Sequence, residues 1–497
     1  MANHANDLDD TAAVPSKPAA ALLSCPDELM VEIFSYGCAG PDDIGHSYEI
    51  MRLNEPRCRA SFITAAVCQR WRSISLSHPT LWHYIGIPAL GKLGDEAVSR
   101  LLDYTQLVLA RSQQVPIDVV FNFISGDRHE HILLESFFEP LVQHVSRWRR
   151  FAAVVSGIDA THRVLRLLSS DTPQLWTVQL AYQESSDQHS RDVYPRSFSE
   201  PIRIPASFLP HAPLMKNLCV YNLPEVWEHW NSRPQKSLLV FEIGQLTPPP
   251  SIWDLLAQHS ELTWLVLSCR IVEESTLCVP PPQPIKMPNL RTVWLTRDAY
   301  KIFAMYPNAL QLRSVKLVTL EGPELATLRP WFRSMRESLT TLDLRHILSF
   351  STADVETIQD LPHLDWLQIS GGGQIPQAML DPLLAEEFVP PSQSSSNTSS
   401  EASIEAKPSN QERTRRGVVA MWPRLATFYI FCAWFDDLGA ATFLQLVKKR
   451  SIEGPRNAAN VPKWRNMQVI LYQAMGFSAE QLEEMENMGV QTLTDGS

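Results

Sequence analysis

Cysteine and histidine are the residue types in this sequence that most often ligate metals or act as nucleophiles, and the chain of 497 residues has 8 Cys and 14 His. The cysteines stand at positions 25, 38, 58, 68, 219, 269, 278 and 432, and no two of them form a Cys-x-x-Cys pair. Because structural zinc sites use paired spacings, we expect no zinc site. The first twenty residues lack the basic and apolar regions of a secretory signal, so we expect reduced cysteines and a cytoplasmic or nuclear protein.

Sequence motifs of common enzyme classes are also missing. The chain contains no Gly-x-Ser-x-Gly, no P-loop and no His-Glu-x-x-His. The run Gly371-Gly372-Gly373 follows an apolar stretch of strand length and resembles a phosphate-binding loop, but no Lys-Ser or Lys-Thr pair follows it, which favours a turn. We therefore predict a protein without catalytic activity, metal or cofactor, with an enzyme as the alternative class.

The composition restricts the kinds of partner. The formal net charge is −11, whereas a protein that binds nucleic acid by releasing counterions needs an excess of basic residues. No window approaches the roughly 18 apolar residues that a membrane span requires. With 44% hydrophobic residues and a length beyond what one core usually supports, the chain should be soluble and folded in more than one unit, without a nucleic-acid or membrane partner.

An internal repeat indicates the elements that would position a functional site. In each copy an apolar residue is followed by a second one three positions later and by a third one two positions after that. The copies begin at Leu175, Met215, Leu238, Leu262, Leu290, Leu312, Leu339, Leu364 and Leu425. From Met215 to Leu364 the starts lie 22 to 28 residues apart, within the range of about 20–29 residues that is typical of leucine-rich repeats.

The repeat predicts an α/β fold with a parallel strand stack. The fourth and sixth residues of each copy point to one side of a strand, so both should enter the core. Helical patterns separate several copies, for example over residues 251–258 and 438–450. We expect a leucine-rich-repeat-like solenoid over residues 100–480, interrupted by a disordered Ser-rich insert over 390–416, and a disordered tail over 1–21. An unrelated α/β protein with amphipathic strands is the alternative.

The repeat departs from the standard one at its ninth position. Leucine-rich repeats usually have Asn or Cys there, and this chain has Leu223, Arg270, Asp298, Leu320, Ile347 and Gly372. Without a buried amide ladder at this position, we expect the solenoid to be irregular.

The fifth and seventh residues of each copy should face the concave side of the sheet, where a protein target would bind. They include aromatic and polar residues of both charges, a mixture that is common at protein-recognition surfaces. Our candidate target-binding group is Trp294, Lys316, Asp343 and Arg345. The alternative is that loops or terminal segments cover these positions.

The segment 22–87 reads as helical. Pro26 and two acidic residues begin a helix in which Leu29 and Ile33 share a face. After an insert over residues 36–59, a second helix should carry one apolar stripe formed by Ile63, Val67, Trp71 and Ile74. The sequence Pro79-Thr80-Leu81-Trp82 follows.

These motifs resemble an F-box. The resemblance rests on Pro-Asp-Glu-Leu-x-x-x-Ile-Phe from Pro26, on Val-Cys-Gln-Arg-Trp-Arg-Ser-Ile from Val67, and on Pro-Thr-Leu-Trp from Pro79. It covers residues 22–87 and is strongest to the F-box proteins of mushroom-forming fungi, which combine this domain with degenerate leucine-rich repeats. Cys25 stands where the family usually has Leu.

The resemblance implies a substrate receptor of a Skp–cullin–F-box ubiquitin ligase, which would bind the Skp adaptor, through it a cullin, and an unknown target protein. Carried over by position, the residues that contact the adaptor or support that contact are Pro26, Leu29, Ile33, Val67, Cys68 and Trp71. Trp71, Leu81 and Trp82 have an alternative role, which is to pack this segment against the first repeats. A scaffold that binds proteins without promoting their degradation is the alternative function.

Overall fold

The computed structural model divides the chain into two compact units, residues 1–193 with 207–214, and residues 194–206 with 215–497. It describes residues 24–38, 55–89, 93–124, 128–183, 208–223, 238–244, 252–269, 280–347, 349–371, parts of 374–380, 425–452 without 432, 434 and 436, and 468–493 without 474. The tail over 1–21, the insert over 390–416 and most of the insert over 36–59 lie outside these residues. Along the described chain, no helix combines the length and the apolar character that crossing a bilayer requires.

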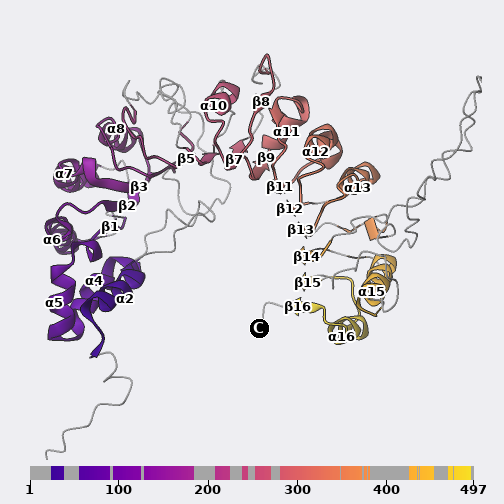
Figure 1. Ribbon diagram of the computed structural model, residues 1–497, viewed down its shortest axis with the longest axis horizontal. Coiled ribbons are helices and arrows are strands. Elements are labelled where there is room, and N and C mark those ends of the chain that lie inside the picture. The colour runs from indigo at the N-terminus through magenta and orange to yellow at the C-terminus, as the bar shows by residue number, and fades with distance from the viewer. Residues whose placement is uncertain are drawn as a thin grey trace, which may run out of the picture. The chain divides into compact units, whose positions relative to one another are not determined.

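The first unit joins a helical segment to four parallel strands (Figure 1). Its elements in chain order are α2 (Asp27–Cys38), α4 (Glu55–Val67), α5 (Gln69–Ser77), η1 (Pro79–Leu81), β1 (Tyr84–Ile87), α6 (Asp95–Ser112), β2 (Ile117–Ile124), α7 (Arg128–Val142), η3 (Val145–Arg147), β3 (Trp148–Val155), α8 (Ile158–Leu167) and β4 (Thr177–Tyr182). The compact unit therefore extends from the predicted segment 22–87 through the first strands of the array.

The predicted single helix from Ile63 to Ile74 is wrong, because the helix breaks at Cys68. The backbone of Cys68 is extended (φ −157°, ψ 170°), and its Sγ accepts a hydrogen bond from the backbone N–H of Trp71 at 3.5 Å. Cys68 thus acts as the N-cap of a new helix, α5. The apolar stripe is divided as a result, so that Val67 is 56% exposed while Ile74 is 2% exposed.

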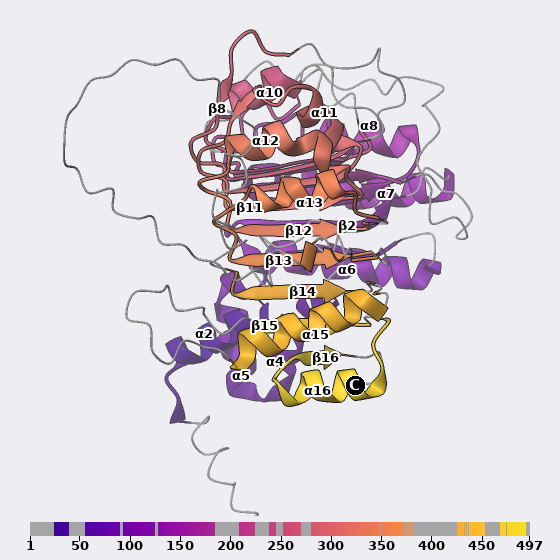
Figure 2. The same ribbon diagram turned by 90° about the vertical axis from the view of Figure 1, so that its right-hand side faces the viewer.

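The second unit is a ladder of parallel strands with helices on one side (Figures 1 and 2). Its main strands in order are β5 (Asn217–Tyr221), β6 (Val240–Gly244), β7 (Trp264–Cys269), β9 (Thr292–Arg297), β11 (Leu317–Glu321), β12 (Thr341–Arg345), β13 (Trp366–Ser370), β14 (Thr427–Phe431), β15 (Gln468–Tyr472) and β16 (Gln491–Leu493). The helices are α10 (Ile252–Gln258), α11 (Ala299–Met305), η5 (Leu325–Leu328), α12 (Arg329–Ser334), α13 (Thr352–Gln359), α15 (Asp437–Ile452) and α16 (Ala479–Asn487), and a separate strand pair is formed by β8 (Ile285–Lys286) and β10 (Leu310–Gln311). The α/β class and the parallel strand stack are confirmed, as are the helices at 252–258 and 437–452.

One copy of the repeat is displaced by three residues from its predicted frame. Val318 pairs with Val293 of β9 and with Leu342 of β12, so the copy begins at Val315 and not at Leu312. Leu312 is also fully buried, which explains why both frames fit the apolar pattern. With the corrected frame, this copy starts 25 residues after Leu290 and 24 residues before Leu339, so the spacing is more even than predicted. Leu320 is then a sixth-position residue and not a ninth-position one.

Each unit includes strands that the predicted copies did not contain, namely β1, β2 and β3 in the first unit and β15 and β16 in the second. Trp82, which precedes β1, and Ile85 and Ile87 of β1 have the spacing of the repeat and are all buried. The repeat architecture therefore begins inside the segment that was predicted to be only helical.

A left-handed backbone conformation recurs at the eighth position, directly after the sixth and seventh residues of the strand. It is found at Asn222, Arg297, Gly322, His346, Gly371 and Gln473, with φ between 47° and 131°. The backbone N–H of Gly322 donates to the carbonyl of Arg345 at 2.8 Å, and that of Gly371 donates to the carbonyl of Phe431 at 3.3 Å. These backbone bonds continue the ladder beyond the strand, and strand pairing in the described part of the second unit keeps a continuous register despite the missing Asn ladder.

We expect Gly371→Ala to destabilise the second unit by about 3 kcal/mol. Gly371 has φ 131°, and a Cβ added there would lie 2.5 Å from the Cα of His346 and 2.6 Å from the backbone N of Ile347, neither of which can move without distorting the ladder. The matched control is Gly322→Ala at the same repeat position, where φ is 61° and the nearest atom is 3.9 Å away, so that only a cost of about 1 kcal/mol is expected. Urea unfolding measures both, and equal losses would contradict the steric argument.

Candidate protein-binding surfaces

Helices α2 and α4 present large apolar side chains to solvent. Leu29 and Ile33 on α2 are each 51% exposed, and Ile63 and Val67 on α4 are 59% and 56% exposed. Each pair has i,i+4 spacing and therefore lies on one face of its helix. We call these four residues the helical apolar face. The opposite side of α2 is packed, since Met30, Phe34 and Cys38 are buried.

Contacts behind this face hold α2 and α5 together. The rings of Phe34 and Trp71 lie 4.8 Å apart between centroids, and Arg70 forms an ion pair with Asp27 at 2.6 Å. Arg70 also donates a hydrogen bond to the carbonyl of Cys25. The six predicted adaptor-contact residues thus have two kinds of environment. Pro26, Leu29, Ile33 and Val67 are exposed, whereas Cys68 caps α5 and the half-buried Trp71 packs against Phe34.

Leu81 and Trp82 belong to the core of the first unit. They are 2% and 1% exposed. The Nε1 of Trp82 donates to the carbonyl of Ser75 at 2.7 Å, and the Arg111 guanidinium of α6 lies 4.2 Å from the Trp82 ring centroid. The alternative interpretation, in which these two residues pack the helical segment against the first repeats, is confirmed.

A buried ion cluster attaches α4 to the sheet. Asp118 of β2 accepts hydrogen bonds from Arg149 at 2.9 and 2.8 Å and from Arg57 of α4 at 2.8 Å, and its side chain is 3% exposed. Arg57 also donates to the carbonyl of Cys38 at 2.7 Å and lies 4.3 Å from the ring centroid of Tyr84. Through this one guanidinium, the end of α2, the start of α4 and the first strands of the sheet are held in a single arrangement.

Two opposing effects determine the pKa of Asp118. Burial favours the neutral carboxyl, but the hydrogen bonds and charge of Arg149, together with the charge of Arg57, outweigh it and lower the pKa below the ordinary value. Burial also lowers the pKa of His83, whose Nε2 lies 3.0 Å from Arg57. A neutral imidazole nitrogen can accept a hydrogen bond from that guanidinium, which an imidazolium cannot.

We expect Asp118→Asn to cost about 3 kcal/mol at pH 7, because it leaves two guanidinium groups, one of them buried, without their carboxylate. Since the pKa of Asp118 is lower in the folded protein, its stabilising contribution is complete above the unfolded pKa and is lost as the pH falls through the folded value. Urea unfolding of both proteins at pH 7 and at decreasing pH should therefore show a difference that shrinks only in acid. Glu96→Gln, in an exposed ion pair at 3.8 Å, is the control and should change little. A difference that persists unchanged into acid would contradict the role of the Asp118 charge.

In the second unit, three of the four predicted target-binding residues are neighbours. The Arg345 guanidinium lies 5.0 Å from the ring centroid of Trp294, and its Nε donates to Asp343 Oδ2 at 2.8 Å. Trp294 and Asp343 stand on β9 and β12 at positions that both pair with Thr319 of β11. Thr319 thus completes the group, which we call the β9–β12 patch: Trp294, Thr319, Asp343 and Arg345.

Lys316 does not belong to the β9–β12 patch, because its predicted position in the repeat is wrong. It was assigned to a fifth position in the frame that begins at Leu312, whereas the register makes Thr319 the fifth residue of that copy. Lys316 is exposed and precedes β11, and its carbonyl accepts the backbone N–H groups of Thr340 and Thr341 at 3.0 and 2.9 Å.

Sequence reasoning missed an aromatic pair further along the same face. Phe431 of β14 and Tyr472 of β15 are stacked, with ring centroids 4.4 Å apart and an interplanar angle of 3°. Phe431 was assigned to a seventh position, but its partner was not predicted because β15 was not among the recognised copies. In the described residues, no group of three or more His, Cys, Asp and Glu side chains could hold a metal ion.

Comparisons with known proteins do not assign a family. No family model matches the chain, and no curated protein matches it. Among solved structures, an internalin (inlF) from Listeria monocytogenes aligns with a TM-score of 0.33 and 8% sequence identity over 71% of this chain and 82% of the internalin chain. A TM-score this low carries no argument about the fold or the function of this chain.

Proposed function

We propose that this protein is the substrate receptor of a Skp–cullin–F-box ubiquitin ligase. The helical apolar face binds the Skp adaptor, and through it a cullin, while the β9–β12 patch contributes to the surface that binds a target protein for ubiquitination. One observation carries the proposal. Four apolar side chains on α2 and α4 are each more than 50% exposed, although the inner sides of both helices are packed, and these are Leu29, Ile33, Ile63 and Val67. The resemblance of the segment 22–87 to an F-box supports the same assignment.

Burial of the helical apolar face against a partner would be energetically favourable. A fully buried Leu, Ile or Val side chain contributes roughly 1.5–3 kcal/mol, so four half-exposed ones offer about 4 kcal/mol together. Micromolar affinity corresponds to roughly 8 kcal/mol, and association also costs translational and rotational freedom. The four side chains can therefore form the centre of an adaptor interface, and contacts around them must supply the remainder.

In this proposal the second unit supplies the surface that recognises the target protein. In the β9–β12 patch, the Arg345 guanidinium contacts both the Trp294 ring and the Asp343 carboxylate, and Trp and Arg are enriched at the energetic centres of protein interfaces. In this proposal the receptor itself is not an enzyme, because the rest of the ligase transfers ubiquitin. Its place of action would be the cytoplasm or the nucleus.

We expect the double substitution Leu29→Asp/Ile33→Asp to reduce capture of the Skp adaptor and cullin at least tenfold in co-purification of the full-length protein. Both positions are exposed, so the fold should tolerate the change, whereas two carboxylates in an apolar interface would lose their hydration. Leu438→Asp, at a residue of α15 that is 59% exposed, is the matched control and should capture both proteins like wild type. If the double variant retains the adaptor, or if wild type never captures it, the proposed function is wrong.

Charge reversal tests the target-binding part of the proposal. Arg345→Glu should preserve adaptor capture but abolish cross-linking of target proteins to the second unit. The substitution replaces the positive charge that contacts Trp294 and Asp343 with a negative one. Lys316→Glu makes the same change at an exposed residue outside the β9–β12 patch and should leave the cross-linked proteins unchanged. Quantitative mass spectrometry of both variants after cross-linking is the measurement. Equal losses from both variants, or a loss only from Lys316→Glu, would contradict the role of the patch.

Cross-linked proteins whose abundance does not depend on the receptor would favour a scaffold without degradation.

A further inference from the structure

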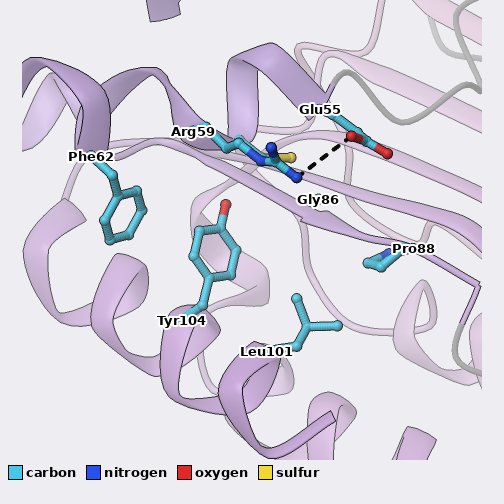
Figure 3. Close-up of a pocket in the computed structure, with 8 residues that line it drawn as sticks. Glu55, Arg59, Phe62, Gly86, Pro88, Leu101 and Tyr104 are labelled. Carbon is cyan, nitrogen blue, oxygen red and sulfur yellow. Dashed lines mark ion pairs between the residues drawn. The ribbon is translucent and has the colours of Figure 1, made fainter. Parts of the chain in front are cut away.

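A pocket of about 340 Å³ lies in the first unit, where α4, β1 and α6 meet (Figure 3). One wall comes from α4, the floor from β1 and the residues after it, and the other wall from α6. The residues that line it are Glu55, Cys58, Arg59, Phe62, Gly86, Pro88, Leu101 and Tyr104. None of the four residues of the helical apolar face lines this pocket, so it is a separate feature of the same helical segment.

Ring and aliphatic side chains make up the walls of the pocket. The Phe62 and Tyr104 rings lie 5.5 Å apart between centroids, and Phe62 meets the buried Trp82 ring edge-on at 4.9 Å. Figure 3 shows Leu101 and Tyr104 projecting from the same helix toward α4, with Pro88 beyond Leu101. Because Phe62 is supported by a fully packed tryptophan, this wall is rigid and preformed, as in most small-molecule sites.

The polar atoms inside the pocket are engaged by the protein itself. The Tyr104 hydroxyl donates to the carbonyl of Tyr84 at 3.2 Å. Burial raises the pKa of the Cys58 thiol to about 11, so the sulfur is a neutral thiol at physiological pH. Neither group offers a charge to a ligand.

The mouth of the pocket carries one charge of each sign. Glu55 and Arg59 stand one helical turn apart on α4, and their side chains form an ion pair at 3.7 Å with exposures of 67% and 73% (Figure 3). Because the two charges compensate each other, the mouth has no net attraction for an anion or a cation. It does offer a hydrogen-bond acceptor and a donor to one polar group of a ligand.

We propose that this pocket binds a neutral, largely apolar small molecule with one or two rings and a single hydrogen-bonding group. The volume supports this size, since a cavity of about 150 Å³ lined by aliphatic and aromatic residues holds one benzene. The ring walls and the neutral interior favour an apolar ring system, and the ion pair at the mouth fits a hydroxyl group at the end of the ligand that remains near solvent.

The test is titration calorimetry of 2-naphthol into the full-length protein. The substitution Leu101→Trp fills the pocket from the α6 wall and should reduce the affinity at least tenfold. Leu107→Trp places the same side chain on the same helix at a residue that is 37% exposed and does not line the pocket, so it should bind like wild type. The Leu29→Asp/Ile33→Asp variant should also bind like wild type, which separates pocket binding from adsorption to the helical apolar face.

A second measurement needs no substitution in the pocket. At about pH 8.5, where a small fraction of the Cys58 thiol is ionised, saturating 2-naphthol should slow alkylation of Cys58 by N-ethylmaleimide at least fivefold, as mapped by mass spectrometry. Alkylation of Cys25 should be unchanged because Cys25 does not line the pocket. Absence of binding to wild type, equal binding to Leu101→Trp and Leu107→Trp, or binding without protection of Cys58 would each overturn the proposal.

Discussion

The parallel backbone ladder is the constraint on which the other features depend. Each strand of the second unit pairs in parallel with the next copy, and the return connection must cross one face of the sheet. The fourth and sixth residues of every copy therefore enter a core beneath the helices, as Val293 and Leu295 do with full burial. The fifth and seventh residues face the opposite side, so a single pairing rule places Trp294, Thr319 and Asp343 next to one another although they are about 25 residues apart in sequence.

Parallel strand pairing in the first unit explains why α4 can serve several purposes. Tyr84, Val120 and Ala152 form a buried cluster with Cys58 of α4 packed against it, on the face opposite to the one that buries Val119 and Phe151. Arg57 fixes the start of α4 to Asp118, Cys58 and Phe62 turn toward the sheet and the pocket, and Ile63 and Val67 face solvent. One helix thus divides its surface among a buried charge, an apolar pocket and the helical apolar face. A change in the packing of its inner side would alter the orientation of its outer one.

Some strands were easier to predict from the sequence than others, and the burial of their two faces is part of the reason. In β13 and β14 of the second unit, buried and partly exposed residues alternate, and the repeat was recognised there. In β2 and β3 both faces are buried, so Val119, Val120 and Phe121 read as a continuous apolar run without alternation. Burial of both faces alone does not hide a copy, since all five residues of β6 are buried and its copy was recognised from the spacing of its apolar residues. The frame of β11 was ambiguous because Leu312 is buried outside the strand, and the extended backbone at Cys68 depends on a sulfur cap that residue type does not signal.

The eighth-position turn shows why a degenerate repeat can still build a regular ladder. In the standard repeat a buried side-chain amide satisfies the backbone where the strand ends, and the identity of that residue is therefore restricted. Here the backbone enters the left-handed region directly after the strand, and the freed N–H groups donate to the neighbouring copy, as those of Gly322 and Ile347 do. That solution costs some conformational strain at Arg297 and His346, which are not glycines, but it removes the requirement for a particular side chain at the ninth position. Leu223 and Ile347 can then be buried there as apolar residues, so the array gains core where the standard repeat needs a polar ladder.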